Sequence, residues 1–279
     1  MASYTTEKIL QVHHWSDRLF SFSTTRSQGL RFDSGQFVML GLDSGDGRRI
    51  SRAYSIASAN YEDHLEFYSI KVPGGAFTSR LQSIATDDAL QVSAKPTGTL
   101  VLRDLKPGRR LFLLATGTGV APFMSLIRDP ETYDRFEHVY LARGAARLAD
   151  LAYARSVIDG LEADPYLGEM VRGRLHDYPT TTREPSGNRG RLSTLTESDK
   201  LFDDLGIEPL DPAEDRAMVC GNMRMVADMG RILEAKGLAA SPGIGVPGDY
   251  VIERAFVESS APKPRAAALT EALAGASLA

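Results

Sequence analysis

The sequence of 279 residues contains one cysteine, Cys220, and one tryptophan. A single cysteine excludes a disulfide within the chain and any iron–sulfur cluster held only by the chain's own cysteines, and it fits a reducing compartment. No apolar run is long enough to span a membrane, and the first residues lack the basic and apolar regions of a signal peptide. We therefore expect a cytoplasmic protein without a membrane partner.

The sequence also lacks a strong excess of charge of one sign. Its 32 Lys and Arg residues face 36 Asp and Glu residues, and the net charge of −4 does not favour a nucleic-acid partner. The five histidines show no metal-ligand spacing, so we predict no metal site. The hydrophobic content of 43% and the length suffice for two domains with a core each.

Residues 1–105 contain short segments with strand-like patterning, separated by Gly-rich or polar turns. This pattern predicts a small antiparallel β-barrel, with one helix near 76–84. The expected strands are 8–13, 18–24, 36–42, 51–57, 64–72 and 90–95.

Residues 106–258 instead alternate apolar segments with helical ones. The segment 110–115, RLFLLA, is typical of a strand buried on both faces. The alternation predicts a doubly wound parallel sheet, whose ligands sit outside the carboxyl ends of the strands. The further expected strands are 138–141, 173–178, 216–220 and 249–258, and the further helices are 150–162, 192–205 and 223–236. The Ala-rich residues 259–279 form either a tail or a short helix.

Two stretches of the barrel carry candidate binding chemistry. In the stretch RAYS, Arg52 and Tyr54 share one face of a strand, about 6.6–7 Å apart. A guanidinium can hold a pyrophosphate and a phenol ring can lie against a planar ring, so the pair suits a flavin dinucleotide. In KVPGGAFTS, two glycines expose backbone amides where Thr78 and Ser79 begin the expected helix, which suits an anion. The alternatives are a surface arginine beside a core tyrosine, and an ordinary helix cap.

The stretch TGTGVAP, from Thr116 to Pro122, resembles a dinucleotide loop of the form G-x-G-x-x-G with proline in the third glycine position. It follows the buried strand and precedes a helix, which is the context that a nucleotide loop needs. Proline is tolerated in a first helical turn, but it cannot allow the close helix–strand approach that a third glycine allows. A plain turn is the alternative.

Arginines, and no carboxylate, occupy the positions after the second parallel strand. Arg143 ends that strand, Arg147 follows, and Arg183, Arg189 and Arg191 flank the next crossover. A site for NAD usually has Asp or Glu at the end of the second strand, so these arginines favour the 2′-phosphate of NADP. Solvated surface charge is the alternative for each. Cys220 also ends a strand, and it either faces the reaction centre or is a buried small residue.

The chain resembles the bacterial ferredoxin/flavodoxin–NADP+ reductase family through five stretches that occur in the family's order. These are RAYSIAS, KVPGGAFTSRLQ, KPTGTL, LLATGTGVAPF and VCGNM. The resemblance covers residues 5–258 and includes the ending VIERAFVE. It implies an FAD-binding antiparallel barrel at 1–105, an NADP-binding α/β domain at 106–258 and a C-terminal extension at 259–279. It also implies hydride transfer between NADPH and N5 of FAD, and one-electron exchange with a ferredoxin or flavodoxin. We expect a monomer.

The resemblance implies roles for individual residues. Those matching FAD-binding positions are Arg52, Ala53, Tyr54, Ser55, Lys71, Val72, Gly75, Ala76, Phe77, Thr78, Ser79, Ala255 and Phe256. Those matching NADP-binding positions are Thr116, Gly117, Thr118, Gly119, Arg143, Gly144, Arg147, Arg183, Arg191, Cys220, Gly221 and Met223. Those matching the hydride-transfer site are Ser55, Cys220, Ala255 and Glu258.

Basic residues near the flavin motifs are candidates for docking an acidic electron carrier, with solvated surface charge as the alternative. They are Arg48, Arg49, Lys71, Arg80 and Lys95. Two other functions compete with the main one: an NAD(P)H-dependent reductase of an oxygenase system or of free flavin, and a non-catalytic NADP-binding regulatory module. Arg52 and Tyr54 argue against the module, since a protein that only senses NADP does not need an FAD site.

Overall fold

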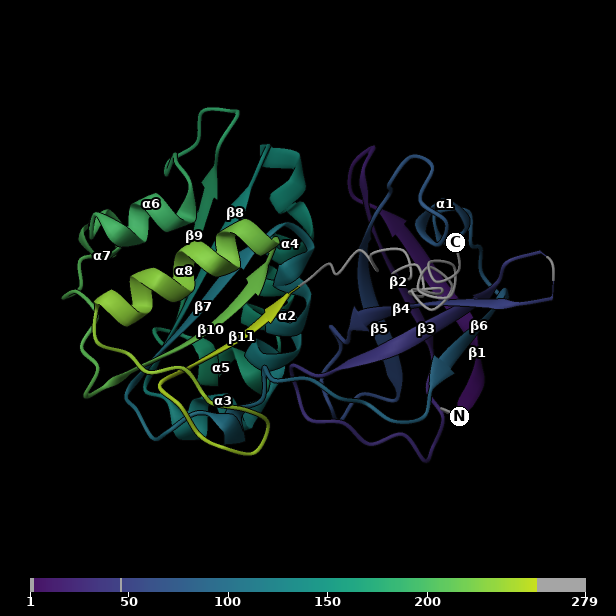
Figure 1. Ribbon diagram of the computed structural model, residues 1–279, viewed down its shortest axis with the longest axis horizontal. Coiled ribbons are helices and arrows are strands. Elements are labelled where there is room, and N and C mark those ends of the chain that lie inside the picture. The colour runs from purple at the N-terminus through teal and green to yellow at the C-terminus, as the bar shows by residue number, and fades with distance from the viewer. Residues whose placement is uncertain (1–2, 46, 255–279) are drawn as a thin grey trace, which may run out of the picture.

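The chain forms two sheets, one antiparallel and one parallel, which lie side by side (Figure 1). The computed structural model describes residues 3–45 and 47–254. Ala255, Phe256 and Glu258 lie outside the described residues, as does the extension 259–279. The predicted fold class is confirmed: an antiparallel barrel precedes a doubly wound α/β domain.

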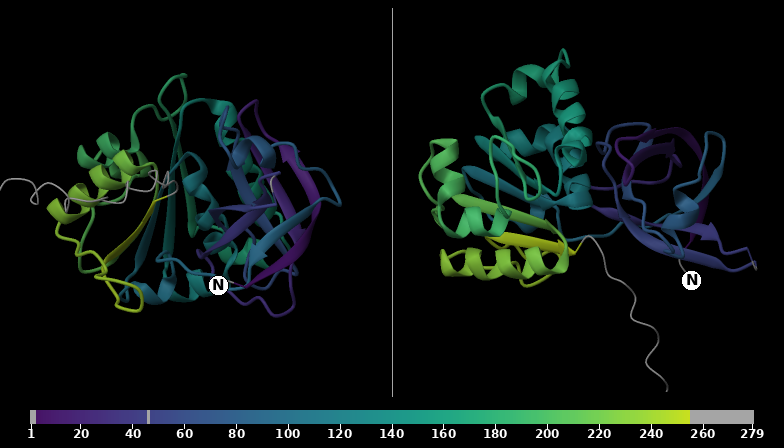
Figure 2. Two further views of the ribbon diagram at one scale, coloured as in Figure 1. Left: turned by 45° about the vertical axis from the view of Figure 1, so that its right-hand side comes forward. Right: turned by 90° about the horizontal axis from the view of Figure 1, so that it is seen from above.

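The antiparallel sheet has six strands in the order β4-β3-β6-β1-β2-β5. They are β1 (Tyr4–His14), β2 (Leu19–Thr25), β3 (Phe37–Asp43), β4 (Arg49–Ser55), β5 (His64–Ile70) and β6 (Ala89–Ser93). The sheet curves until its edge strands β4 and β5 approach each other (Figure 2). The Tyr54 hydroxyl on β4 lies 3.0 Å from Ser69 Oγ on β5, and Ala57 N donates to Glu66 O at 2.8 Å. These contacts close the barrel around an apolar interior that includes Phe22.

The parallel sheet has five strands in the order β11-β10-β7-β8-β9. They are β7 (Arg110–Thr116), β8 (His138–Ala145), β9 (Leu175–Thr181), β10 (Asp215–Gly221) and β11 (Tyr250–Arg254). The chain moves outward from β7 in one direction through β8 and β9, and in the other through β10 and β11. The strand order therefore reverses between β7 and β10, and ligands of such sheets bind at this switch point.

Helices cover both faces of the parallel sheet (Figures 1 and 2). On the face toward the barrel lie α2 (Ala121–Arg128), α3 (Pro130–Arg135), α4 (Ala152–Glu162) and α5 (Leu167–Val171); on the other face lie α6 (Leu192–Glu197), α7 (Lys200–Leu205) and α8 (Met223–Ala235). The helix expected at 192–205 is divided because Asp199 adopts a φ of 60°, in the left-handed region. In the barrel, the expected helix 76–84 shortens to α1 (Thr78–Leu81).

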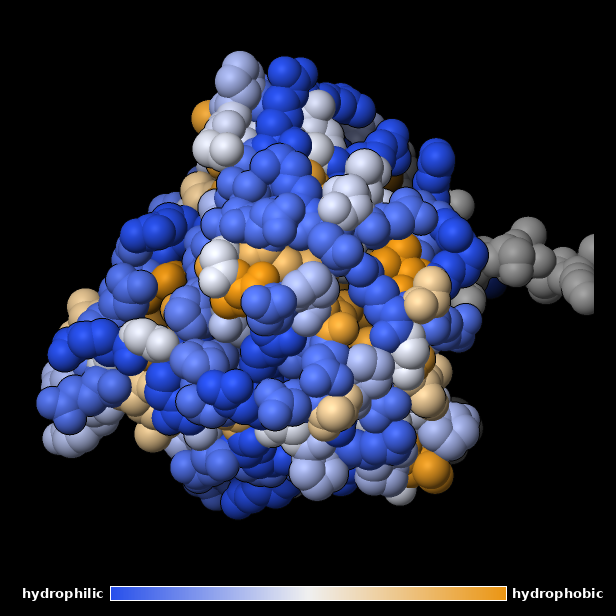
Figure 3. Space-filling view, turned by 90° about the vertical axis from the view of Figure 1, so that its left-hand side faces the viewer, coloured by the Kyte–Doolittle hydropathy of each residue, from blue (hydrophilic) through white to orange (hydrophobic). Residues whose placement is uncertain are grey.

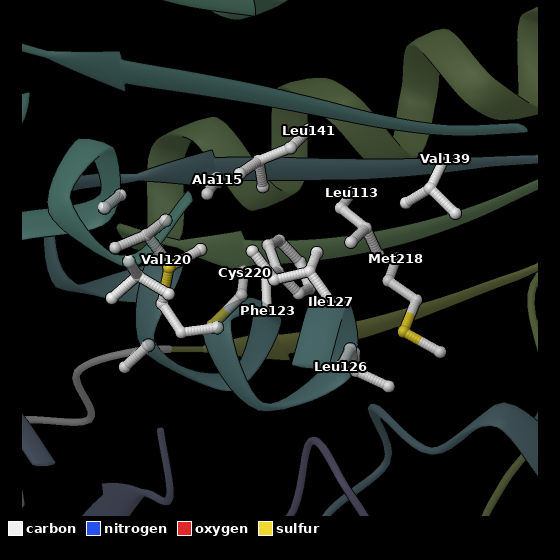
Figure 4. Packing of buried hydrophobic residues seen from close by; sticks show 14 of the residues in the cluster. Leu113, Ala115, Val120, Phe123, Leu126, Ile127, Val139, Leu141, Met218 and Cys220 are labelled. Carbon is white, nitrogen blue, oxygen red and sulfur yellow. The ribbon is translucent and has the colours of Figure 1, made fainter. Parts of the chain in front are cut away.

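One hydrophobic core crosses from the parallel sheet into the barrel. Figure 4 shows its centre, where Leu113 and Cys220 of the sheet face Phe123 of α2. Tyr68 of β5 belongs to the same core and stacks on Tyr153 of α4, with ring centroids 4.2 Å apart and an interplanar angle of 19°. This stacked pair joins the barrel to the α/β domain, and a contact of this kind contributes about 0.5–1.5 kcal/mol beyond the area it buries.

The face of the molecule on the side away from the barrel is mostly hydrophilic, with small apolar areas between the polar side chains (Figure 3). Among the described helices, none combines the length and the apolar composition needed to cross a membrane. The connection from β6 to β7, residues 94–109, contains the predicted domain boundary near residue 105.

Candidate active site

A cavity of about 470 Å³ lies at the switch point, outside the carboxyl ends of the parallel strands. The barrel supplies one part of its wall through Arg18, Leu19 and Ile70. The second domain supplies the rest: Thr116, Gly117, Thr118, Gly144, Ala145, Ala146, Asp150, Thr182, Arg183, Gly190, Arg191, Leu192, Ser193, Asn222, Arg224, Met225 and Asp228. Its volume is in the usual range for a site that binds a small molecule or cofactor.

The glycine-rich loop forms part of this wall. It continues from β7 as a 3-10 turn at residues 117–120, and α2 then starts with Pro122 in its first turn, as predicted. Gly117 has a φ of 56°, which favours glycine. A Cβ atom at Gly119 would clash with the carbonyl oxygen of Cys220 on β10. The loop therefore makes its close backbone approach through its second glycine, and the approach is to the neighbouring strand.

The start of α8 meets the same loop. Asn222 caps the helix by accepting a hydrogen bond from Met225 N at 3.0 Å, and its Nδ2 donates to Thr116 Oγ1 at 3.3 Å. A Cβ atom at Gly221 would clash with the Thr116 hydroxyl, so this crossing also requires glycine. The amides at the start of a 13-residue helix thus lie beside the cavity and favour negative charge there. Met223 lies at this end of α8, is exposed, and does not line the cavity.

Two of the predicted arginines, Arg183 and Arg191, line the cavity. Both are exposed, and neither side chain has a hydrogen bond or ion pair with another described residue. Arg147 lies outside the lining, with its Nε 3.9 Å from Glu184 Oε1. Arg18 and Arg224 add two positive charges that the sequence analysis did not assign to the site. No pattern in the sequence around Arg18 could have assigned it to this site, because Arg18 belongs to the barrel.

Arg143, which was predicted to end the second strand and to bind NADP, is paired within the chain. Its side chain is buried, and Nε and Nη2 each donate to the Asp177 carboxylate at 2.7 Å. Nη1 donates to Leu151 O at 2.9 Å. Side chains alternate along a strand, and Arg143 lies on the face that carries Leu141 toward the helices. The structure therefore gives Arg143 a structural contact, while Arg18, Arg183 and Arg191 bring guanidinium groups to the cavity that have no partner among the described residues.

The flavin motif lies on β4, an edge strand of the barrel. Arg52 is exposed, and its Nη1 donates to the adjacent Ser51 O at 2.8 Å. Burial raises the pKa of Tyr54 to about 12, although the hydrogen bond to Ser69 and the charge of Arg52 counteract it, so the phenol stays neutral. Ala53 is exposed and Ser55, the last residue of the strand, is half-buried.

The second barrel motif, residues 71–79, lies next to β4. The Phe77 ring is buried, with its centroid 5.7 Å from that of Tyr54. A Cβ atom at Gly75 would clash with the Thr78 hydroxyl, which donates to Val72 O at 3.3 Å. The structure thus brings the two predicted parts of the flavin site together. Of the remaining residues, Val72 and Ala76 are exposed, and Lys71 and Ser79 are half-buried.

Lys71 also connects this motif to the cavity, because its backbone N donates to Arg18 O at 2.7 Å.

Cys220 is fully buried and does not line the cavity. Burial, and secondarily the charge of Glu253, raise the pKa of its thiol well above the usual value. Glu253 of β11 lies directly beside Cys220 in the parallel ladder. Burial raises the pKa of Glu253 to about 7, and its Oε2 has no hydrogen-bond partner among the described residues. Glu253 was not predicted from the sequence, and pairing the two end strands in register would have found it.

Comparison with known proteins matches both halves of the chain to family models. Residues 7–101 match the oxidoreductase FAD-binding domain, and residues 113–231 match the oxidoreductase NAD-binding domain. These two ranges coincide with the barrel and with most of the parallel α/β domain.

Individual relatives cover the chain almost completely. It is 55% identical to a ferredoxin–NADP reductase of Pseudomonas aeruginosa, over 92% of this chain and 100% of the relative. It is 49% identical to a flavodoxin/ferredoxin–NADP reductase of Rhodobacter capsulatus, over 90% and 93%. A crystal structure of a ferredoxin NADP+ reductase from Neisseria gonorrhoeae with bound FAD and NADP has a TM-score of 0.81 and 31% identity, and the match covers 92% of this chain and 100% of that one.

Proposed function

Because this chain belongs to the ferredoxin/flavodoxin–NADP reductase family, whose cofactors are FAD and NADP, we propose that the cavity at the switch point is its NADP site and that the β4 edge with residues 71–79 is its FAD site. The observation that carries this proposal is the cavity itself. It has the size of a cofactor site and is walled on one side by the barrel that carries the flavin motifs, and three arginines whose side chains have no partner among the described residues line it: Arg18, Arg183 and Arg191.

In the proposed NADP site, residues 116–118 and the start of α8 bind the phosphates and position the nicotinamide. Arg183 and Arg191 bind the 2′-phosphate by charge-assisted hydrogen bonds, and Arg147 supports them from the edge of the cavity. Gly119 allows the loop backbone to approach β10 closely, and Gly221 leaves room for the Thr116 hydroxyl.

In the proposed FAD site, Arg52 and the backbone amides of residues 75–79 bind the pyrophosphate. Tyr54 offers a ring face that its hydrogen bond to Ser69 holds in place. Lys71, Val72, Ala53 and Phe77 shape the surface around these groups. Ser55 ends β4 at the side where its hydroxyl would lie near the flavin.

The reaction transfers a hydride between NADPH and FAD, and FAD, when bound, exchanges single electrons with the protein carrier. The chain's own residues orient the two cofactors and exclude water between them. Cys220 and Glu253 contribute to that shielding, since Cys220 is buried and Glu253 is half-buried at the carboxyl ends of adjacent strands. At neutral pH, Glu253 can hold a proton there, because its pKa of about 7 allows the neutral carboxyl.

The partner class is a ferredoxin or a flavodoxin. We propose that this carrier docks beside the flavin motifs, where Lys71 and Arg80 add positive charge to that of Arg52, and that the enzyme acts as a cytoplasmic monomer. Arg48, Arg49 and Lys95 remain candidates for the same surface.

The test is NADPH-driven reduction of ferredoxins and flavodoxins from the same cell, compared by catalytic efficiency. We expect FAD-loaded protein to reduce at least one of them much faster than it reduces free flavin. Faster reduction of free flavin than of every carrier would support the alternative reductase. A colourless protein that cannot be reconstituted with FAD would support the regulatory module instead.

A further inference from the structure

Helix α2 connects the proposed NADP loop to the barrel. It starts at Ala121, directly after the loop, and ends at Arg128. Every residue of α2 before Arg128 is buried, between the parallel sheet and the barrel (Figure 4). A helix of this length spans about 12 Å and does not bend easily. The position of Arg128 therefore helps to fix the position of the loop at the other end of the helix.

The side chain of Arg128 crosses to the barrel. Its Nη1 lies 2.7 Å from Glu66 Oε2 and donates to Ala57 O at 3.0 Å. Glu62 Oε2 lies 3.9 Å away. The side chains of Arg128 and Glu66 are only 17% and 18% exposed, so water screens this ion pair weakly.

The same part of the barrel also holds the backbone at the end of α2. The Tyr61 hydroxyl donates to Arg128 O at 3.1 Å, and Asn60 Nδ2 donates to Asp129 Oδ2 at 2.9 Å. All the barrel residues in these contacts belong to residues 57–66, which run from the end of β4 into β5. One segment thus connects the strand of the flavin motif to the end of α2.

We propose that Arg128 is a positioning residue for hydride transfer. By binding Glu66 and Ala57 O, it sets the distance and angle between the NADP loop and the strand that carries Arg52 and Tyr54. This inference rests on the proposed placement of the two cofactors. Arg128 itself contacts neither cofactor site: it lies at the far end of α2 and does not line the cavity.

The charge of Arg128 is secure. Burial alone would lower the pKa of its guanidinium, but Glu66, with smaller contributions from neighbouring groups that include Glu62, outweighs burial and raises the pKa. Arg128 therefore stays charged throughout the working pH range.

A loss of this contact would affect the rate more than the affinity. A displacement of roughly 1 Å between reacting groups can reduce a rate on the order of 100-fold. Most of the affinity for NADP would be retained, because the loop backbone, Arg183 and Arg191 belong to the second domain and move together, and the barrel adds only Arg18 to the arginines of the cavity.

The test uses FAD-loaded Arg128→Met and Arg128→Lys proteins. Rapid mixing with NADPH gives the limiting rate of flavin reduction, difference spectra give the Kd for NADP+, and amide hydrogen exchange reports the mobility of residues 116–120 without NADP. Arg110→Met is the matched control. Arg110 also forms a buried ion pair, with Nε 2.6 Å from Asp215 Oδ1, but this pair lies at the amino end of β7, away from the barrel.

We expect Arg128→Met to lower the limiting rate about tenfold or more, with the Kd changed less than about threefold and faster exchange in residues 116–120. Arg128→Lys should recover part of the rate, and Arg110→Met should lower the melting temperature only. An unchanged limiting rate in Arg128→Met would overturn the proposal. If Arg128→Met does not fold, the same three measurements are made on Glu66→Gln, and an unchanged limiting rate in that variant would overturn the proposal. Failure of NADPH to reduce the wild-type flavin would instead overturn the cofactor placement.

Discussion

The barrel and the α/β domain build their binding sites in different ways. On the barrel, the proposed FAD site consists of side chains on an edge strand and a short adjoining turn, and Arg52 is exposed. In the α/β domain, the proposed NADP site is a cavity at the switch point, where Gly119 and Gly221 leave no room for a Cβ atom beside β10 and Thr116. The barrel site should therefore be sensitive to the loss of single side chains, and the cavity to the addition of atoms to its glycines.

The arginines of the chain show the same contrast on a smaller scale. Arg110 and Arg143 are buried against carboxylates of the chain itself, whereas Arg52 and Arg191 have no carboxylate partner among the described residues. An arginine without a carboxylate of its own is the one available to an incoming phosphate.

The largest effect is expected from Arg52→Ala, which should weaken FAD binding about a hundredfold. Charge-assisted hydrogen bonds to a pyrophosphate contribute about 1.5–3 kcal/mol each. Fluorescence titration of FAD into the FAD-free protein measures the effect. Arg49→Ala, on the same strand but with its guanidinium 3.7 Å above the Tyr4 ring, is the control and should bind FAD normally. Equal FAD affinity in wild type and Arg52→Ala would remove Arg52 from the site.

Gly119→Ala should destabilise the protein by about 1–3 kcal/mol and raise the KM for NADPH, because its Cβ would push β10 away from the loop. Gly117→Ala has no atom within 4 Å of the new Cβ and adds only the strain of a positive φ. Urea unfolding of both variants measures the difference. If the two substitutions destabilise equally, the backbone crossing does not limit the shape of the cavity.

Arg191→Ala should narrow the preference for NADPH over NADH about tenfold, since one charge-assisted contact to the 2′-phosphate is lost. The ratio of kcat/KM for the two nucleotides measures the preference. Arg143→Met serves as the contrast: it should reduce stability, because Asp177 is left without its partner, and leave the preference unchanged. A smaller ratio of kcat/KM for NADPH to kcat/KM for NADH in Arg143→Met would show that Arg143 contributes to binding the 2′-phosphate.

The smallest effect concerns pH. The raised pKa of Glu253 means that the folded chain keeps a proton that the unfolded chain releases. The contribution of this group to stability is therefore fully present below its unfolded pKa of 4.5 and is lost as the pH rises through about 7. Between about pH 6 and about pH 8 the loss is about 1 kcal/mol. Urea unfolding at several pH values measures this loss. The free energy of unfolding should fall between about pH 6 and about pH 8 in the wild type and not in Glu253→Gln; an equal fall in both proteins would contradict the prediction.

The two domains, most of their strands and the glycine-rich loop could be predicted from the sequence, because the pattern of apolar residues indicates the strands and the glycines indicate the loop. The helices α3 and α5 were missed because helices of six and five residues are too short to show a helical period. The orientation of Arg143 was missed because its place at the strand end does not show that its partner is Asp177. Arg18 reaches the cavity from the other domain, and Arg128 contacts Glu66 across the two domains. Both depend on residues far apart in the sequence, so no local sequence pattern predicts them.

The central claim is that the cavity is built for NADP and delivers it to a flavin bound on the barrel. Anaerobic mixing of FAD-loaded protein with NADPH or NADH, followed at the flavin absorbance band, tests it most directly. We predict that NADPH bleaches the band and does so at least about tenfold more efficiently than NADH, as expected for a site that binds the 2′-phosphate. A flavin that NADPH does not bleach, or that both nucleotides bleach equally well, would contradict the claim.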